Sequence, residues 1–173
     1  MIESSRVCRC VLCHDYGDRD DYDAADRGVI ENVEKFGWSV TGVPSDDDGP
    51  GWAYTIGRWH SQGRPELAMF GLDLGVMQSC LNTLGSRDGL ADGDSLDDVI
   101  KGYPLRLRAV EPDWFRAFFG HGMWFYRHPP IPFLEVVWPD RDGAFPEDTG
   151  SLAQPHLWLK PIDHPKGVWT QDV

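Results

Sequence analysis

The chain has 173 residues, of which 41% are hydrophobic and 12% aromatic, so it is long enough to fold around a core of its own. This composition excludes a disordered chain, and no apolar run approaches the roughly 20 residues that a membrane-spanning helix needs. The net charge of −12 repels phosphate backbones, so we expect neither nucleic acid nor a membrane as a partner.

Hydrophobic periodicity, caps and turn residues predict the elements in chain order. The first is a helix over residues 23–37, which Asp23 can cap and Gly37 can end. The others are strands over 38–43, 51–59 and 66–74, a helix over 73–85, a short helical turn over 95–101, a strand over 104–110, a helix over 111–120, a strand over 133–138 and an edge strand over 156–159. Residues 60–65, 86–95 and 139–150 are expected to be loops.

The order of these elements indicates the fold class. Strands come first in succession and then alternate with helices, which predicts a single α+β domain with a mostly antiparallel sheet flanked by two or three helices. We expect a cysteine-rich and acidic N-terminal segment over residues 1–23, the α+β domain over 24–160 and a tail over 161–173.

Three of the four cysteines, Cys8, Cys10 and Cys13, stand within six positions near the N-terminus, in the stretch CRCVLCH. The first ten residues lack the apolar stretch of a secretion signal, so we expect a cytoplasmic protein whose thiols stay reduced. In a Cys-x-Cys stretch held extended, both side chains point to one side, and Cys13 can turn back toward them. Three thiolates can then converge on one soft cation such as zinc.

The sequence does not decide which residue would be the fourth ligand of such a site. His14 is the nearest candidate, but its adjacency to Cys13 makes simultaneous ligation awkward, and a remote residue such as His60 or His164 fits better. Cys80 is a poor candidate because its helical spacing places it on an apolar face. Redox chemistry and plain structural cysteines remain alternatives, since the paired Cys-x-x-Cys signature of zinc sites is missing.

A second group of chemically active side chains follows the predicted strand at residues 51–59. Its members are Tyr54, Arg58, Trp59, His60, Arg64 and Glu66, and Trp138 of the late strand can join them to line a pocket. His60 can act as a base near neutral pH, and Arg58 or Arg64 can bind a carboxylate or a phosphate. The alternative is a polar hairpin loop in which Glu66 pairs with an arginine.

The turn after the late strand is rich in aspartate: Asp140, Asp142 and Asp148 surround Gly143. The pattern Asp-x-Asp-Gly matches part of a calcium loop, but a β-turn whose side chains bond its own backbone is favoured. If this turn and the loop before Glu66 lie at the same edge of the sheet, then Glu66 and Asp140 share a site.

Three blocks occur together in this chain, GWSV, WAYTIGRWHSQGRPELAMFGLD and VVWPDRDGAFPED. In order and spacing they resemble a bacterial family catalogued as domain of unknown function 4262, over roughly residues 30–150. That family has a histidine where Arg64 stands and a tryptophan where Glu147 stands. The resemblance implies no reaction, so the function has to be inferred from the residues.

Two classes of function follow. The first is a small-molecule-handling domain, with an enzyme as one form of it, in which His60, Glu66 and Asp140 converge as catalytic residues in one cleft. The second is a non-catalytic protein that binds another protein, as an interaction or immunity-type partner, through acidic and aromatic surface.

Overall fold

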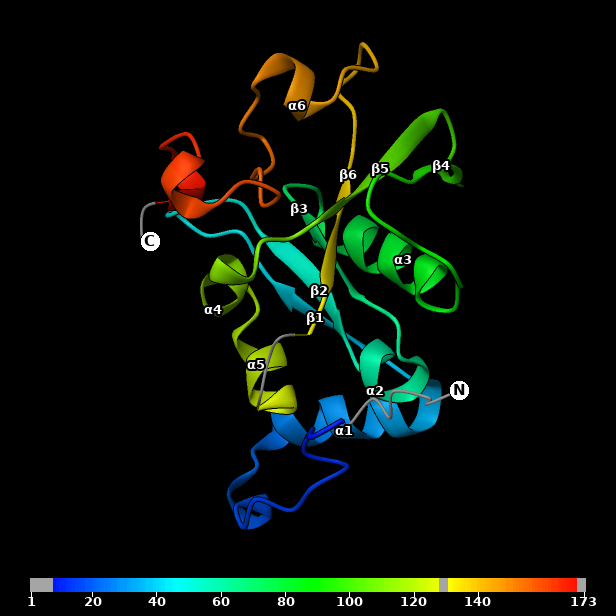
Figure 1. Cartoon of the computed structure of the whole chain (residues 1–173), viewed down its shortest axis with the longest axis vertical. Coiled ribbons are helices and arrows are strands. Elements are labelled where there is room, and N and C mark those ends of the chain that lie inside the picture. The colour runs from blue at the N-terminus through cyan, green and yellow to red at the C-terminus, as the bar shows by residue number, and fades with distance from the viewer. Residues whose placement is uncertain (1–7, 128–130, 171–173) are drawn as a thin grey trace, which may run out of the picture.

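The computed structural model describes residues 8–127 and 131–170, so residues 1–7 and 171–173 of the expected N-terminal segment and tail lie outside it. A six-stranded sheet with the order β1-β2-β3-β6-β5-β4 forms its centre (Figure 1). The strands are β1 (Ser39–Val43), β2 (Trp52–Ile56), β3 (Glu66–Phe70), β4 (Ser95–Ile100), β5 (Tyr103–Ala109) and β6 (Phe133–Val137). Neighbouring strands are antiparallel except β3 and β6, which are parallel. The predicted α+β fold with a mostly antiparallel sheet is confirmed.

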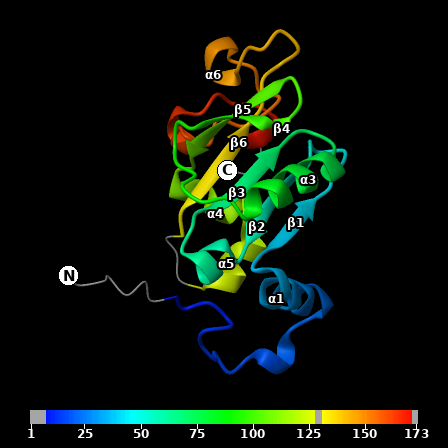
Figure 2. The same cartoon turned by 90° about the vertical axis from the view of Figure 1, so that its right-hand side faces the viewer.

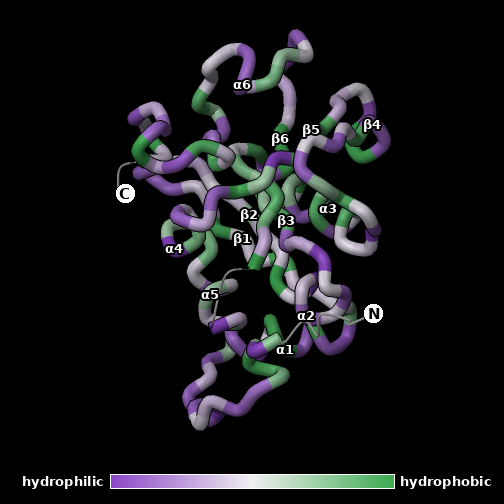
Figure 3. The backbone as a smooth tube through the Cα atoms, in the orientation of Figure 1, coloured by the Kyte–Doolittle hydropathy of each residue, from purple (hydrophilic) through white to green (hydrophobic). Residues whose placement is uncertain are grey.

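Helices cover both faces of the sheet. They are α1 (Ala24–Phe36), α2 (Arg58–Gln62), α3 (Leu74–Gly85), α4 (Phe115–Phe118), α5 (Gly120–Tyr126) and α6 (Pro146–Thr149). Single 3-10 turns stand at Arg19–Asp21, Pro112–Trp114, Pro161–Asp163 and Val168–Thr170. One core cluster joins the sheet to α1, α4 and α5, and the other joins its opposite face to α3 (Figure 2). The apolar stretches of the chain gather in the strands and the helices packed on them (Figure 3).

The predicted helix caps are confirmed. Asp23 and Asp26 form a reciprocal capping box at the start of α1, and Gly37 ends that helix in the left-handed conformation with φ 94°. Asp73 accepts a hydrogen bond from the N–H of Val76 and so caps α3. These helix ends therefore follow from residues within one turn of each boundary.

Several other predicted elements are wrong. The strand expected over 51–59 ends at Ile56, because Gly57 adopts φ 112° and helix α2 follows it, running from Arg58 into the expected loop. The helical turn expected over 95–101 is the edge strand β4, which pairs with β5. The helix expected over 111–120 is divided between a 3-10 turn, α4 and α5, and residues 156–159 form no strand. In the described ranges, no helix is long and apolar enough to cross a membrane.

Candidate metal centre

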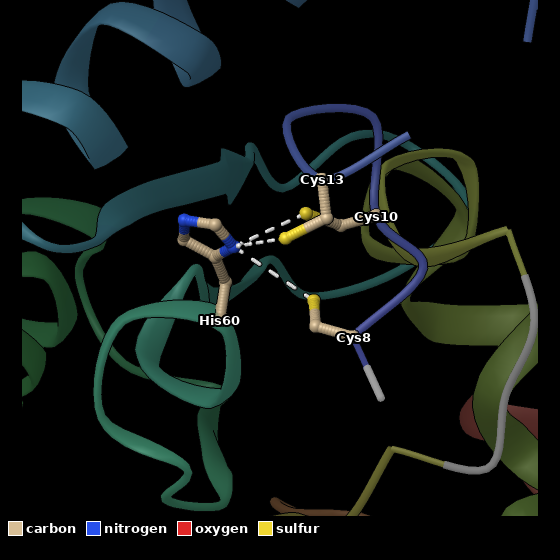
Figure 4. Close-up of side chains that lie close together, drawn as sticks. All are labelled: Cys8, Cys10, Cys13 and His60. Atoms are coloured by element: carbon tan, nitrogen blue, oxygen red, sulfur yellow. Dashed lines mark hydrogen bonds between the residues drawn. The ribbon is translucent and has the colours of Figure 1, made fainter. Parts of the chain in front are cut away.

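Cys8, Cys10, Cys13 and His60 meet at one end of the sheet, although His60 is 47 to 52 positions away from the cysteines (Figure 4). The Nδ1 atom of His60 lies 3.2 Å from the Sγ of Cys10, 3.3 Å from that of Cys13 and 3.7 Å from that of Cys8. All four donor atoms lie within 4.8 Å of one another. All four cysteines of the chain are free thiols.

A tight turn brings the cysteines together. The backbone N–H groups of Cys13 and His14 both donate to the carbonyl oxygen of Cys10, at 3.1 and 3.0 Å, which folds Cys13 back over Cys10. The turn is attached to α5 because the N–H of Val11 donates to the carbonyl of Phe125 at 2.9 Å. Cys10 and Val11 are fully buried, so the turn is part of the folded core.

The donor set fits a tetrahedral zinc ion. With about 2.3 Å from zinc to sulfur and about 2.0–2.1 Å to an imidazole nitrogen, the sulfur and nitrogen donors of such a site stand about 3.6 Å apart. The three distances to His60 Nδ1 lie around this value. Thiolate and imidazole are also the ligand types that zinc prefers in structural sites. The four side chains can therefore hold one metal ion.

The other two histidines considered for this site lie outside the cluster. The ring of His14 packs edge-on against that of Tyr16, with centroids 4.7 Å apart. His164 is buried beside Trp114, where its Nε2 accepts the backbone N–H of His156 at 2.9 Å. Of the candidates for the fourth ligand, the structure thus places only His60 at the cysteines.

Hydrogen bonding within the cluster shifts the pKa values of Cys8 and Cys10 in opposite directions. The Cys10 thiol donates to Cys8 and lowers the pKa of Cys8 to about 4, while the same bond raises the pKa of Cys10. Burial raises the pKa of Cys13. A negative charge on Cys8 opposes the deprotonation of Cys10 and Cys13, because like charges at this distance repel and raise the pKa of both thiols.

His60 is held in place by the start of helix α2. The carboxylate of Glu66 accepts the backbone N–H groups of Gly57 at 2.9 Å and Trp59 at 3.1 Å. The hydroxyl of Tyr126 accepts the N–H groups of Gly57 at 3.1 Å and His60 at 3.3 Å, and it donates to Glu66. Burial raises the pKa of Glu66, and the hydrogen bonds that it accepts act in the opposite direction. Tyr126 was not singled out from the sequence, because no local signal relates it to a residue 66 positions away.

The arginines of the expected pocket contact backbone and loops. Arg58 is fully buried, and its guanidinium donates to the carbonyl oxygens of Gly85, Pro65 and Arg87. Arg64 pairs with Asp88 on the surface. Arg58 therefore braces the loops around α2, and its donors do not face an open cleft.

The expectation that Glu66 and Asp140 share a site is wrong. Glu66 stands opposite Phe133 in the parallel pair of β3 and β6, so it lies where β6 begins, whereas Asp140 follows the other end of β6. Asp140 accepts the N–H groups of Asp142 and Ala144, both at 2.9 Å, as in the favoured β-turn. For the same reason, the expectation that His60, Glu66 and Asp140 converge in one cleft is wrong.

The remaining aromatic candidates lie apart from one another. The hydroxyl of Tyr54 accepts the N–H of His121 at the start of α5, at 3.1 Å. Trp59 is half-buried and packs against the core cluster on the face of the sheet that α1, α4 and α5 cover. The indole of Trp138 donates to the carbonyl of Phe70 at 2.7 Å. In the part of the chain that the structure describes, the hydrogen bonds of Tyr54 and Trp138 thus tie these two side chains to different parts of the fold.

Trp138 instead borders a hollow of about 400 Å³ at the end of the sheet that carries Asp140. Its walls come from the start of α3, the β4–β5 hairpin and the turn after β6, and they are almost entirely apolar. The lining residues are Leu72, Val76, Ile100, Tyr103, Trp138, Pro139, Asp140 and Arg141.

Comparison with known proteins gives a family and no reaction. A family model described as a domain of unknown function (DUF4262) matches residues 32–151, which is more than half of the chain. The match contains His60, Glu66 and Tyr126, and the three clustered cysteines precede it. No curated protein and no solved structure matches the chain.

Proposed function

The chain belongs to the DUF4262 family, and we propose from its candidate metal centre that it is a zinc-binding protein whose metal fastens the N-terminal segment to the folded domain. The convergence of three cysteine sulfurs on His60 Nδ1 carries this proposal. Four protein donors fill a tetrahedral shell and leave no open position for a substrate, which is typical of a structural site.

The charges around the cluster favour a cation. Three thiols lie together, and the acidic run from Asp15 to Asp26 begins two positions after Cys13. A bound cation offsets the mutual repulsion that opposes the deprotonation of neighbouring thiols. Zinc, which binds thiolate and imidazole without redox chemistry, suits this set.

The metal would join parts of the chain that are otherwise far apart in sequence. His60 belongs to the domain, whereas the cysteines belong to the segment before α1. Beyond the cluster, the segment is attached by the Val11–Phe125 hydrogen bond and by a 2.7 Å ion pair between Arg127 and Asp18. Val11 and Tyr22 are also buried in the core cluster on this face of the sheet. A bound metal would add a direct link between this segment and helix α2, which none of these contacts provides.

Elemental analysis of the purified protein tests the proposal, with His60→Ala and His14→Ala as a matched pair. We expect about one zinc per chain in the natural protein and in His14→Ala. His60→Ala removes one of the four donors and should retain much less zinc at equal chelator concentration. Zinc-free natural protein after gentle purification, with all three thiols open to a thiol reagent, would contradict the proposal.

A second candidate function concerns the hollow beside Trp138. Its apolar walls and its volume of about 400 Å³ suit a small apolar molecule, in keeping with a small-molecule-handling domain. Binding is proposed here without a reaction, because the Asp140 carboxylate is engaged by its own turn.

Fragment binding followed by the NMR signal of the Trp138 indole N–H tests this second function. Aliphatic and aromatic fragments should shift that signal in the natural protein. Val76→Glu, which places a charge in the hollow, should abolish the shift. Val168→Glu, at an exposed valine outside the hollow, should retain it. If no fragment binds, an interaction with another protein becomes the better interpretation of this surface.

A further inference from the structure

We propose that Tyr126 and Glu66 act as positioning residues for the metal centre, by capping the short helix that carries His60. The inference rests on the proposed zinc site and deepens it. It starts from a property of α2: the helix has five residues, and the residue at its N-cap is Gly57, which has no side chain to accept the free N–H groups of the first turn.

A glycine is required at this position. Gly57 has φ 112°, and a Cβ atom there would lie 2.7 Å from a methyl group of Val33 and 3.1 Å from the carbonyl oxygen of Gly37. The chain therefore cannot place serine, threonine or aspartate here, and the cap has to come from another part of the fold.

Glu66 and Tyr126 supply that cap. Between them they accept the N–H groups of Gly57, Trp59 and His60, at 2.9 to 3.3 Å. Both are buried, with 0% of Glu66 and 2% of Tyr126 exposed, so water does not compete for these hydrogen bonds.

The cap is itself fixed in the sheet. The Thr55 hydroxyl donates to the second carboxylate oxygen of Glu66 at 2.6 Å. The oxygen of that Thr55 hydroxyl also accepts the backbone N–H of Leu67 at 2.9 Å. The hydroxyl of Tyr126 contacts the backbone N–H of His60 itself, so its position constrains the residue that presents Nδ1 to the sulfurs. A metal ligand on a loose single-turn helix would lose this alignment.

The test compares Tyr126→Phe with Tyr54→Phe. The two hydroxyls have similar surroundings: each is buried, each lies in the same core cluster, and each accepts a backbone N–H in the first turn of a short helix. The hydroxyl of Tyr126 also accepts the N–H of Gly57 and donates to Glu66, so stability is measured beside metal affinity. Only that of Tyr126 contacts the helix of His60. Affinities for Zn²⁺ and Co²⁺ are measured by chelator competition, the Co²⁺ visible spectrum reports the ligand set, and urea unfolding reports stability.

We expect Tyr126→Phe to bind both metals about 10- to 100-fold more weakly than the natural protein, the usual effect of losing an outer-shell partner. Tyr54→Phe should lose stability as well but keep its metal affinity. Glu66→Asp withdraws the carboxylate from α2 and should also weaken metal binding. It replaces Tyr126→Phe as the test variant if Tyr126→Phe does not fold.

The outcomes separate this inference from the proposed function. Natural protein that binds neither metal overturns the proposed function. Natural protein that binds zinc, with equal affinity in Tyr126→Phe and Tyr54→Phe, overturns the positioning role alone.

Discussion

Two glutamates, Glu66 and Glu135, are fully buried in the sheet, and their surroundings differ. Glu66 accepts hydrogen bonds at both oxygens, from Thr55, Tyr126 and two backbone N–H groups. Glu135 accepts only the N–H of Leu157, at 3.2 Å, and its Oε2 is buried with no hydrogen-bond partner among the described residues. Burial favours the neutral form of a carboxyl that accepts so few hydrogen bonds, and it raises the pKa of Glu135 well above its usual value of 4.5.

This difference predicts that Glu135 makes the stability of the folded protein depend on pH. Between pH 4.5 and its raised pKa, the folded protein holds a proton that the unfolded chain has lost, so stability falls as pH rises. The fall is at most about 1.4 kcal/mol per pH unit for one group. Glu135→Gln cannot titrate, so its stability relative to the natural protein should increase with pH across this window. Urea unfolding of both proteins from pH 5 to pH 9 measures it, and a constant difference would contradict the prediction.

At the scale of elements, two glycines in helical segments have opposite roles. Gly28 lies inside α1, where an added Cβ atom would meet nothing within 4 Å. Gly57 starts α2 with φ 112° and has Val33 against the place of its missing side chain. Gly28 therefore lowers the stability of its helix, whereas the backbone conformation at Gly57 requires a glycine.

Alanine substitutions should separate the two glycines. Gly28→Ala is expected to stabilise the protein by about 0.5–1 kcal/mol, because alanine loses less backbone freedom in a helix. Gly57→Ala is expected to destabilise it by about 1–3 kcal/mol through the strained φ and the clash with Val33. Thermal or urea unfolding gives both values. Equal effects at the two positions would show that the conformation of Gly57 is not required.

Metal removal is a second prediction at this scale. The metal would be held by the segment before α1 and by α2, whereas the sheet is stabilised by core clusters on both of its faces. Chelation of zinc should therefore speed amide hydrogen exchange in residues 8–23 and leave the sheet strands protected. Exchange measured by mass spectrometry with and without chelator tests this. Uniform loss of protection would mean that the metal supports the whole domain.

For the whole molecule, the net charge of −12 leads to a prediction about partners. Several arginines are already paired with acidic groups: Arg106 and Arg108 with Glu147, Arg87 with Asp98 and Arg127 with Asp18. Such side chains are not available to replace counterions on a phosphate backbone. We expect no binding to single- or double-stranded oligonucleotides in fluorescence anisotropy titrations at low salt. Tight binding that weakens as salt is added would contradict this.

The sequence by itself determined the features that depend on near neighbours. Asp23 and Gly37 marked the ends of α1, Asp73 marked the start of α3, and the spacing of Cys8, Cys10 and Cys13 indicated a possible metal site. Caps and turns act over three or four residues, so their signals can be read along the chain.

Only the tertiary structure decided the features that depend on distant pairing. Residues 95–100 form a strand because β5 offers them hydrogen bonds, and Glu66 lies far from Asp140 because β3 and β6 are parallel. His60, rather than the adjacent His14, lies at the cysteines because buried Glu66 and Tyr126 hold the helix that carries it. No local pattern encodes these contacts, since each joins residues that only the packing of the sheet brings together.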